Sequence, residues 1–112
     1  MALWRGNGMS GGTDANVYGK NATSIDVKLA YICSETWYFK MSLYRYNESR
    51  DQYVKIETKT GNLPVNCKIV TTKFYLKNKL AGNYYVGVEI FKNQLNNSPY
   101  HVTRTNAFVV KR

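Results

Sequence analysis

Side chains that could carry out catalysis are few in this sequence. The chain has one histidine, His101, and its seven carboxylates are scattered along 112 residues. General acid–base chemistry needs titratable groups that converge, and no G-x-S-x-G nucleophile motif, H-E-x-x-H zinc motif or glycine-rich phosphate loop is present. We therefore expect His101 to be an exposed strand residue, and enzyme is the least favoured class of function. We expect no metal site and no cofactor.

The two cysteines, Cys33 and Cys67, favour a disulfide over a metal site. They are too few for a zinc centre, and no C-x-x-C or H-x-x-x-H spacing accompanies them. A disulfide would place the protein in an oxidising compartment, so we expect it to be secreted or at the cell surface. The alternative is a pair of unrelated buried thiols in a cytosolic domain. No apolar stretch approaches 18 residues, so no transmembrane segment is expected.

Basic residues outnumber acidic residues by 16 to 7, which gives the chain a net charge of +9 at pH 7. A charge of this sign attracts polyanions such as nucleic acids, acidic membranes and wall polymers. The basic residues are spread along the chain, without a run of five. Spread charge is more typical of a solvated surface than of a nucleic-acid footprint, so nucleic acid is the less favoured partner.

The composition indicates which elements must position these residues. Ten tyrosines, with many valines and threonines, favour pleated strands, whereas Ala, Leu and Glu, which dominate helices, are scarce. Residues 1–16 hold four glycines and no periodic pattern, so we expect a flexible lead-in. Residues 17–112 suffice for one compact domain. The sequence therefore predicts a single all-β domain, monomeric, after a flexible N-terminal segment.

Hydrophobic side chains alternate with polar ones from residue 17 onward, in segments separated by turn residues. Period-2 alternation is typical of antiparallel strands with one buried face. Seven such strands are expected, over residues 16–20, 24–32, 37–46, 53–60, 68–77, 83–92 and 100–111. The side chains expected to face the core are Ile25, Val27, Leu29, Tyr31, Trp37, Phe39, Met41, Leu43, Val54, Ile56, Val70, Phe74 and Leu76.

The stretch from Leu80 to Ile90 has the pattern L-x-G-x-Y-x-V-x-V-x-I. It resembles the tyrosine corner of immunoglobulin-like and fibronectin type III β-sandwiches. By this resemblance, Tyr84 is a structural residue whose hydroxyl bonds back to the backbone of the preceding turn, and Gly82 supplies the backbone angles of that turn. The resemblance implies a seven-stranded antiparallel sandwich and carries no information on function.

The same resemblance assigns the seven segments to strands A, B, C, C′, E, F and G in chain order. In that topology B and E are antiparallel neighbours, so Cys33 at the end of B lies beside Cys67 at the start of E. A bridge there would differ from that of immunoglobulin domains, which joins B to F through the core. The chain also resembles small secreted β-sandwich proteins of unknown function from bacilli.

A sheet of strands C′, C, F and G would present an aromatic and basic outer face. Aromatic rings interleaved with cations suit sugar rings, anionic polymers or a protein partner. The alternative is an ordinary solvent-facing sheet with cross-strand pairs. The candidate ligand-binding residues on this face are Tyr38, Lys40, Tyr44, Tyr46, Tyr53, Lys55, Tyr85 and Phe91, with Lys59 beside them.

A second candidate surface is the loop end of the sandwich, formed by residues 34–36, 62–64 and 93–100. Such loops often bind ligands, although the residues here are ordinary turn formers. The favoured hypothesis is a small secreted non-enzymatic binding protein that engages an anionic or glycan ligand at a cell surface through its aromatic face. The alternative is a secreted inhibitor or toxin-like effector that binds a protein target through these loops.

Overall fold

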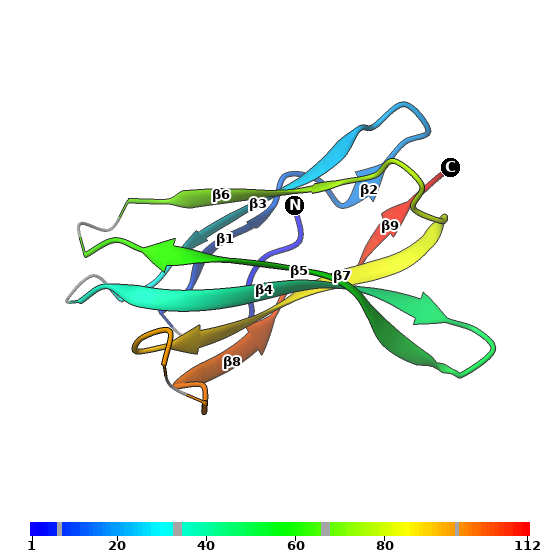
Figure 1. The fold of residues 1–112 in the computed structure, drawn as a ribbon. Helices are drawn as coiled ribbons and strands as arrows, with labels where there is room; N and C mark the ends of the chain where they lie inside the picture. Colours follow the sequence, from blue (N-terminus) through cyan, green and yellow to red (C-terminus); the bar gives the residue numbers. More distant parts are fainter. Residues whose placement is uncertain (7, 33–34, 66–67, 96) are drawn as a thin grey trace.

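The computed structural model describes residues 1–6, 8–32, 35–65, 68–95 and 97–112. These residues form nine strands and no helix, arranged as two sheets that pack face to face (Figure 1). The prediction of an all-β sandwich is therefore confirmed. Within the described part of the chain, no helix could span a lipid bilayer.

The smaller sheet has three strands in the order β1, β3, β6. Their bounds are β1 Ser10–Thr13, β3 Ser24–Ala30 and β6 Val70–Tyr75. The larger sheet has the order β2, β9, β7, β4, β5, and its sixth strand, β8, pairs with β7. Its strands are β2 Val17–Tyr18, β4 Trp37–Asn47, β5 Gln52–Leu63, β7 Gly82–Phe91, β8 His101–Arg104 and β9 Phe108–Val110.

The count of seven strands is corrected to nine because two predicted elements differ in the structure. An additional strand, β1, lies within residues 1–16, where a flexible lead-in was predicted, and it pairs antiparallel with β3. The strand predicted at residues 16–20 is β2, which pairs parallel with β9. The last strand is divided at Thr105, between β8 and β9. There the Val86 N–H donates to the Thr105 hydroxyl (3.1 Å) while the Thr105 N–H donates to the Val86 carbonyl (2.8 Å), so a side-chain bond replaces one bond of the ladder.

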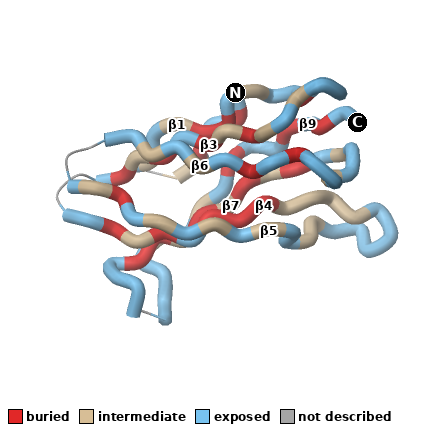
Figure 2. The backbone as a smooth tube through the Cα atoms, turned by 45° about the horizontal axis from the view of Figure 1, so that its top comes forward, coloured by how far each residue is buried: buried red, intermediate tan, exposed pale blue. Residues whose placement is uncertain are grey.

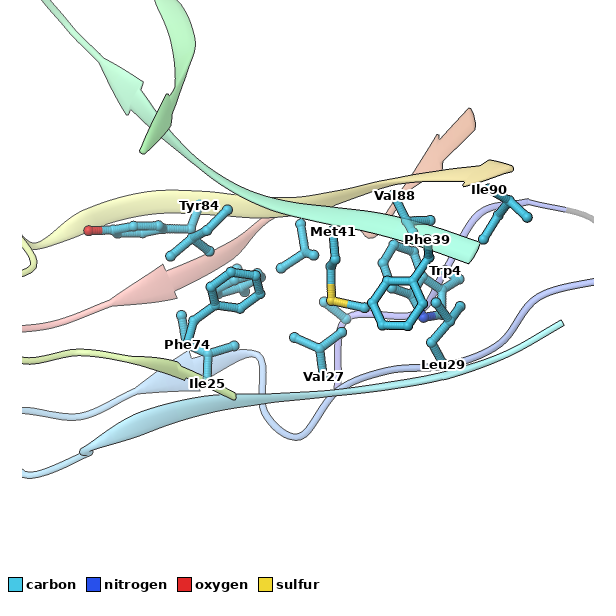
Figure 3. Packing of buried hydrophobic residues seen from close by; sticks show 14 of the residues in the cluster. Trp4, Ile25, Val27, Leu29, Phe39, Met41, Phe74, Tyr84, Val88 and Ile90 are labelled. Carbon is cyan, nitrogen blue, oxygen red and sulfur yellow. The ribbon is translucent and has the colours of Figure 1, made fainter. Parts of the chain in front are cut away.

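The core lies between the two sheets and is built from the alternation visible in the sequence. Buried positions concentrate where the sheets face each other (Figure 2). Figure 3 shows Phe39, Met41 and Val88 of the larger sheet reaching toward Val27 and Leu29 of the smaller sheet. Among the predicted inward residues, those buried in the structure are Ile25, Val27, Leu29, Tyr31, Trp37, Phe39, Met41, Leu43, Phe74 and Leu76.

The prediction for the inner side of β5 is wrong. Val54 is only half-buried, and Ile56 is 42% exposed. The pairing of β4 with β5 shifts register at a bulge between Leu43 and Tyr44, and the β4–β5 hairpin projects beyond the rest of the sandwich (Figure 1). The inner side of β5 is therefore buried only near its end, where Leu63 pairs with Trp37.

The expectation of a flexible N-terminal lead-in is also corrected. Ala2 and Trp4 are buried in the core cluster, and Trp4 is only 8% exposed. The Trp4 indole donates to the Lys28 carbonyl of β3 (2.8 Å), and the Arg5 N–H donates to the Arg104 carbonyl of β8 (3.0 Å). The segment therefore joins the two sheets along one side of the sandwich.

The tyrosine corner is present as the sequence pattern predicts. The Tyr84 hydroxyl donates to the Leu80 carbonyl, and the Tyr84 side chain is fully buried. Gly82 has a φ of +145°, which a residue with a Cβ rarely adopts. The Arg45 side chain donates to the adjacent Ala81 carbonyl (2.6 Å from Nη2), which holds the same turn against β4.

The strands predicted over residues 24–32 and 68–77 correspond to β3 and β6. Their pairing confirms the prediction that these two strands are neighbours. The two strands are antiparallel, with register pairs from Ser24 with Tyr75 to Leu29 with Val70. The end of β3 therefore lies beside the start of β6. The bridge expected between Cys33 and Cys67 lies outside the described residues and stays a prediction.

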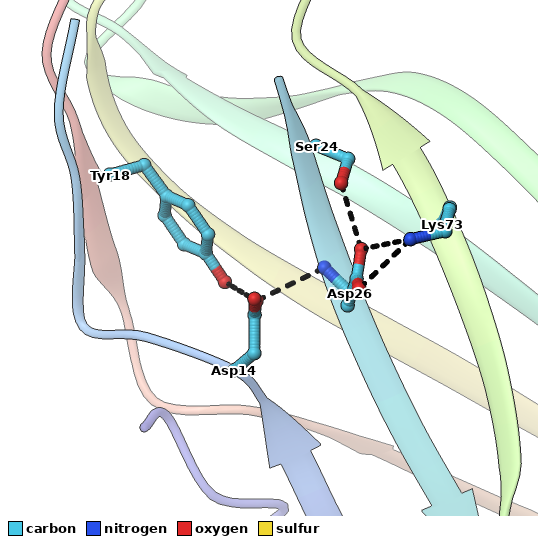
Figure 4. A network of polar contacts seen from close by, with 5 residues as sticks. All are labelled: Asp14, Tyr18, Ser24, Asp26 and Lys73. Carbon is cyan, nitrogen blue, oxygen red and sulfur yellow. Dashed lines mark hydrogen bonds and ion pairs between the residues drawn. The ribbon is translucent and has the colours of Figure 1, made fainter. Parts of the chain in front are cut away.

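A polar network holds the chain between β1 and β2 against the smaller sheet (Figure 4). Asp14 accepts hydrogen bonds from the Tyr18 hydroxyl and from the Asp26 N–H. Asp26 in turn accepts from Ser24 (2.8 Å) and from Lys73 (3.0 Å). Lys73 and Ser24 lower the pKa of the Asp26 carboxyl, and burial together with Asp14 raises the pKa of Tyr18. The network thus fixes the point where the chain passes from one sheet to the other.

Candidate functional site

The outer face of the larger sheet carries the predicted aromatic residues on β4, β5 and β7. Phe39, Met41 and Leu43 of β4 point into the core, so the residues between them point outward. Tyr44 lies opposite Tyr85 on β7 and opposite Lys55 on β5. The structure therefore brings these three side chains together on one face, as the sequence predicts.

Four side chains from four neighbouring strands form a row across this face. The Tyr44 and Tyr85 rings stack, with centroids 4.7 Å apart and planes 15° apart. The Lys55 ammonium lies 5.9 Å from the centre of the Tyr44 ring, and the Arg104 guanidinium lies 4.8 Å from the centre of the Tyr85 ring. Because the strands lie in the order β5, β4, β7, β8, a cation stands at each end. We call Lys55, Tyr44, Tyr85 and Arg104 the cation–tyrosine ladder.

Two further tyrosines extend the ladder toward the tip of the β4–β5 hairpin. The Tyr53 ring packs edge-on against Tyr85, with centroids 4.7 Å apart, and Tyr46 packs edge-on against Tyr53 at 5.4 Å. The Tyr46 hydroxyl donates to the Asp51 carboxylate, which raises the pKa of Tyr46. Burial raises the pKa of Tyr85, so its hydroxyl stays protonated at neutral pH. The hydroxyls of Tyr46 and Tyr85 are therefore neutral at neutral pH.

Tyr38, Lys40 and Phe91 form a separate group at the other end of the face. The Tyr38 and Phe91 rings are 6.1 Å apart, and the Lys40 ammonium lies 5.3 Å from the Phe91 centroid. Phe91 was predicted to be available for a ligand, but it is only 3% exposed, since neighbouring side chains cover it. Lys59 is not on this face: it pairs with Glu57 and lies over the Tyr75 ring of β6, because its strand partner Met41 faces the core.

A hollow of about 340 Å³ opens beside the ladder. Tyr44 and Tyr85 form one wall. The floor is low because Ser42 and Gly87 are small, and a Cβ at Gly87 would lie only 3.0 Å from Cε2 of Tyr44. Four charged side chains also line the hollow: Arg5, Lys40, Glu89 and Arg104.

The hollow is electropositive. It contains three cations and one carboxylate, and in the described part of the chain none of Arg5, Lys40 and Arg104 forms an ion pair with a carboxylate. Ser42 is satisfied by the Thr58 hydroxyl (2.9 Å). The predicted set included only Lys40 from this charged group, and Arg5 was assigned to the lead-in. The arrangement can therefore attract and hydrogen-bond an anion beside aromatic rings.

His101 differs from its expected environment. It is half-buried, and its Nδ1 lies 3.0 Å from the Tyr31 hydroxyl. Its pairing with Ile90 across the strands turns it toward the core side, where Tyr31 packs edge-on against Trp37. Among the described residues, no group of three His, Cys, Asp or Glu side chains gathers as metal ligands would.

At the loop end, Ser34 and Asn96 lie outside the described residues. The Trp37 and Tyr100 rings pack there with centroids 4.9 Å apart, and Lys92 lies over the Tyr100 ring. Leu95 is 90% exposed. The described residues of this end therefore present exposed apolar side chains, with the Lys92 cation over Tyr100.

Comparison with known proteins identifies the fold family. Comparison with curated proteins found no match. A family model described as the YqgA MG2 macroglobulin domain matches residues 5–111. The matched range takes in all nine strands, the cation–tyrosine ladder and the hollow. The chain therefore belongs to the YqgA MG2 macroglobulin domain family, and its fold is an immunoglobulin-like β-sandwich.

Proposed function

We propose that the protein is a non-enzymatic binding module that engages an anionic glycan or a related anionic polymer at a cell surface. The observation that carries this proposal is the cation–tyrosine ladder, which places Arg104 and Lys55 in defined positions on an open face. The net charge of +9 would attract a polyanion to the protein, and the ladder would supply the local contacts.

The geometry of the ladder favours an anionic ligand over a neutral one. The Tyr44 and Tyr85 rings stack, so each covers one face of the other, and a cation lies over each ring. The contacts left for a ligand are ring edges, phenolic hydroxyls and cationic groups, which suit a charged and hydroxylated chain. Rings that hold the cations also lower the entropy lost when those cations bind an anion.

Replacing Tyr44 and Tyr53 together by alanine is expected to weaken binding to carboxymethyl dextran by at least about tenfold, because it removes both rings that support Tyr85. Binding of the purified protein to the immobilised polymer is the measurement. Tyr75→Ala is the matched control: Tyr75 is 57% exposed and also carries a lysine over its ring, but it lies on β6 in the other sheet.

Equal affinity of the wild-type and double variants would contradict the proposal, provided both unfold at the same temperature. That result would favour the loop end, where exposed Leu95 and Tyr100 suit the alternative of an inhibitor or effector that binds a protein. Binding that falls steeply with salt and equally for every polyanion would indicate a purely electrostatic attraction.

A secreted location, like the resemblance to secreted proteins of bacilli, is part of this proposal. The two cysteines support it: in the sequence Cys33 follows β3 and Cys67 precedes β6, and these two strands pair with each other. We expect the native protein to resist thiol alkylation and to take up two labels only after reduction, as measured by intact mass. Two labels on the unreduced native protein would contradict both the bridge and the compartment.

A further inference from the structure

The hollow beside the ladder has the features of a subsite for one small group. Its volume of about 340 Å³ is at the lower end of the range for small-ligand sites. Its depth depends on Gly87, since the Tyr44 ring leans over this position and leaves no room for a Cβ without a shift. One ring-sized unit fits such a space, whereas a bulky side chain at residue 87 would fill it.

The cations around the hollow come from three separate parts of the chain. Lys40 lies on β4, Arg104 on β8, and Arg5 on the N-terminal segment. The Arg5 N–H donates to the Arg104 carbonyl (3.0 Å), so the two arginines are fixed as backbone neighbours. The Arg104 guanidinium stacks on Tyr85, which restrains it at the rim of the hollow. Three cations at one small site, none of them ion-paired with a carboxylate among the described residues, favour an oxyanion as the occupant.

Glu89 sets a limit on what the occupant can be. It lines the same hollow and lies opposite Lys40 across β4 and β7. A carboxylate would repel a second anion placed beside it but can accept hydrogen bonds from hydroxyl groups. The occupant should therefore combine a single oxyanion with neighbouring hydroxyls.

Resting on the proposed function, we propose that the hollow binds one acidic sugar unit, with its carboxylate or phosphate on Arg104 and its hydroxyls toward Glu89. The planar fork of Arg104 would bind two oxygens of the anion at once, and Lys40 and Arg5 would contribute charge. The tyrosine wall would contact the adjoining unit of the polymer.

The test uses dextran of one chain length in three forms: neutral, carboxymethylated and phosphorylated. Arg104→Lys keeps the charge but removes the fork, and it is expected to weaken binding of the charged forms by about tenfold. Gly87→Ala keeps every charge and ring and is expected to weaken them severalfold by narrowing the hollow. Arg50→Lys, at an exposed position of the β4–β5 turn, is the matched control and should leave binding unchanged. The carboxylated and phosphorylated arms distinguish the two sources of the oxyanion.

Unchanged affinity in both Arg104→Lys and Gly87→Ala would overturn the subsite. If the double variant of Tyr44 and Tyr53 still lost binding in that case, the proposed function would stand without the subsite. If none of the three variants had an effect, both proposals would fail. Equal binding of DNA and charged dextran at matched charge, with no loss in either Arg104→Lys or Arg50→Lys, would also overturn the subsite, because it would show that net charge alone decides binding.

Discussion

Substitution of Trp4 by alanine is expected to lower the free energy of unfolding by about 3–5 kcal/mol. Trp4 is 8% exposed, and its indole N–H donates to the Lys28 carbonyl of β3 (2.8 Å). Alanine would leave a cavity between the sheets and an unsatisfied carbonyl beside it. It would also loosen residues 2–4, which lie between β1 and the chain that follows β8. The Asn106 N–H of that chain donates to the Leu3 carbonyl.

Urea denaturation followed by tryptophan fluorescence measures this loss, with Trp37 as the remaining reporter. Leu3→Ala is the matched control, since Leu3 is next in the chain but 52% exposed, and it should change stability by less than about 0.5 kcal/mol. A small effect of both substitutions would show that the N-terminal segment is dispensable, as a flexible lead-in would be.

The parts of the fold that follow from local periodicity could be predicted from the sequence. Every second residue is buried in β3, in β4 as far as Leu43 and in β7 from Tyr84 to Ile90, because these parts of the central strands are covered by the opposite sheet. The burial of β5 did not follow its hydrophobic alternation. It depends on how far the other sheet extends and on a β-bulge, and no single residue type in the sequence predicts that bulge. Ile56 is therefore exposed although its local sequence resembles that of a buried strand.

The candidate site was predictable only in part, for the same reason. Tyr44, Tyr85 and Lys55 lie on strands whose facing follows from alternation, so their shared face could be predicted. Arg104 joins them through the register of β8 on β7, and Arg5 through the docking of the N-terminal segment. Neither relation has a local signal in the sequence, so the hollow was not predicted.

The glycines of the N-terminal segment account for the misassigned lead-in. Glycine without periodicity indicates flexibility when nothing packs on it, but it also permits close approach of two backbones. A Cβ at Gly11 would lie 2.4 Å from the Lys28 carbonyl oxygen. Gly11 therefore serves here to let β1 lie tightly against β3.

Gly12→Ala is expected to destabilise the protein by about 3–5 kcal/mol, through loss of the same docking that Trp4 anchors. Gly12 has a φ of +148°, and a Cβ there would lie 2.1 Å from the Ala2 carbonyl oxygen. This contact is between two backbones, so no side-chain rotation can relieve it, and residues 2–4 must move away. Urea denaturation measures the loss. Gly19→Ala is the matched control: a Cβ at Gly19 would meet no atom within 4 Å, so stability should be unchanged or slightly raised.

The double variant of Trp4 and Gly12 separates local strain from loss of the segment. If Gly12→Ala acts by undocking residues 2–4, adding Trp4→Ala should cost little more, because the tryptophan has already left the core. Additive losses would mean that the segment stays docked in Gly12→Ala and that strain within β1 is the cause. Undocking would also displace Arg5 from the hollow, so Gly12→Ala should weaken binding of charged dextran, whereas Gly19→Ala should not.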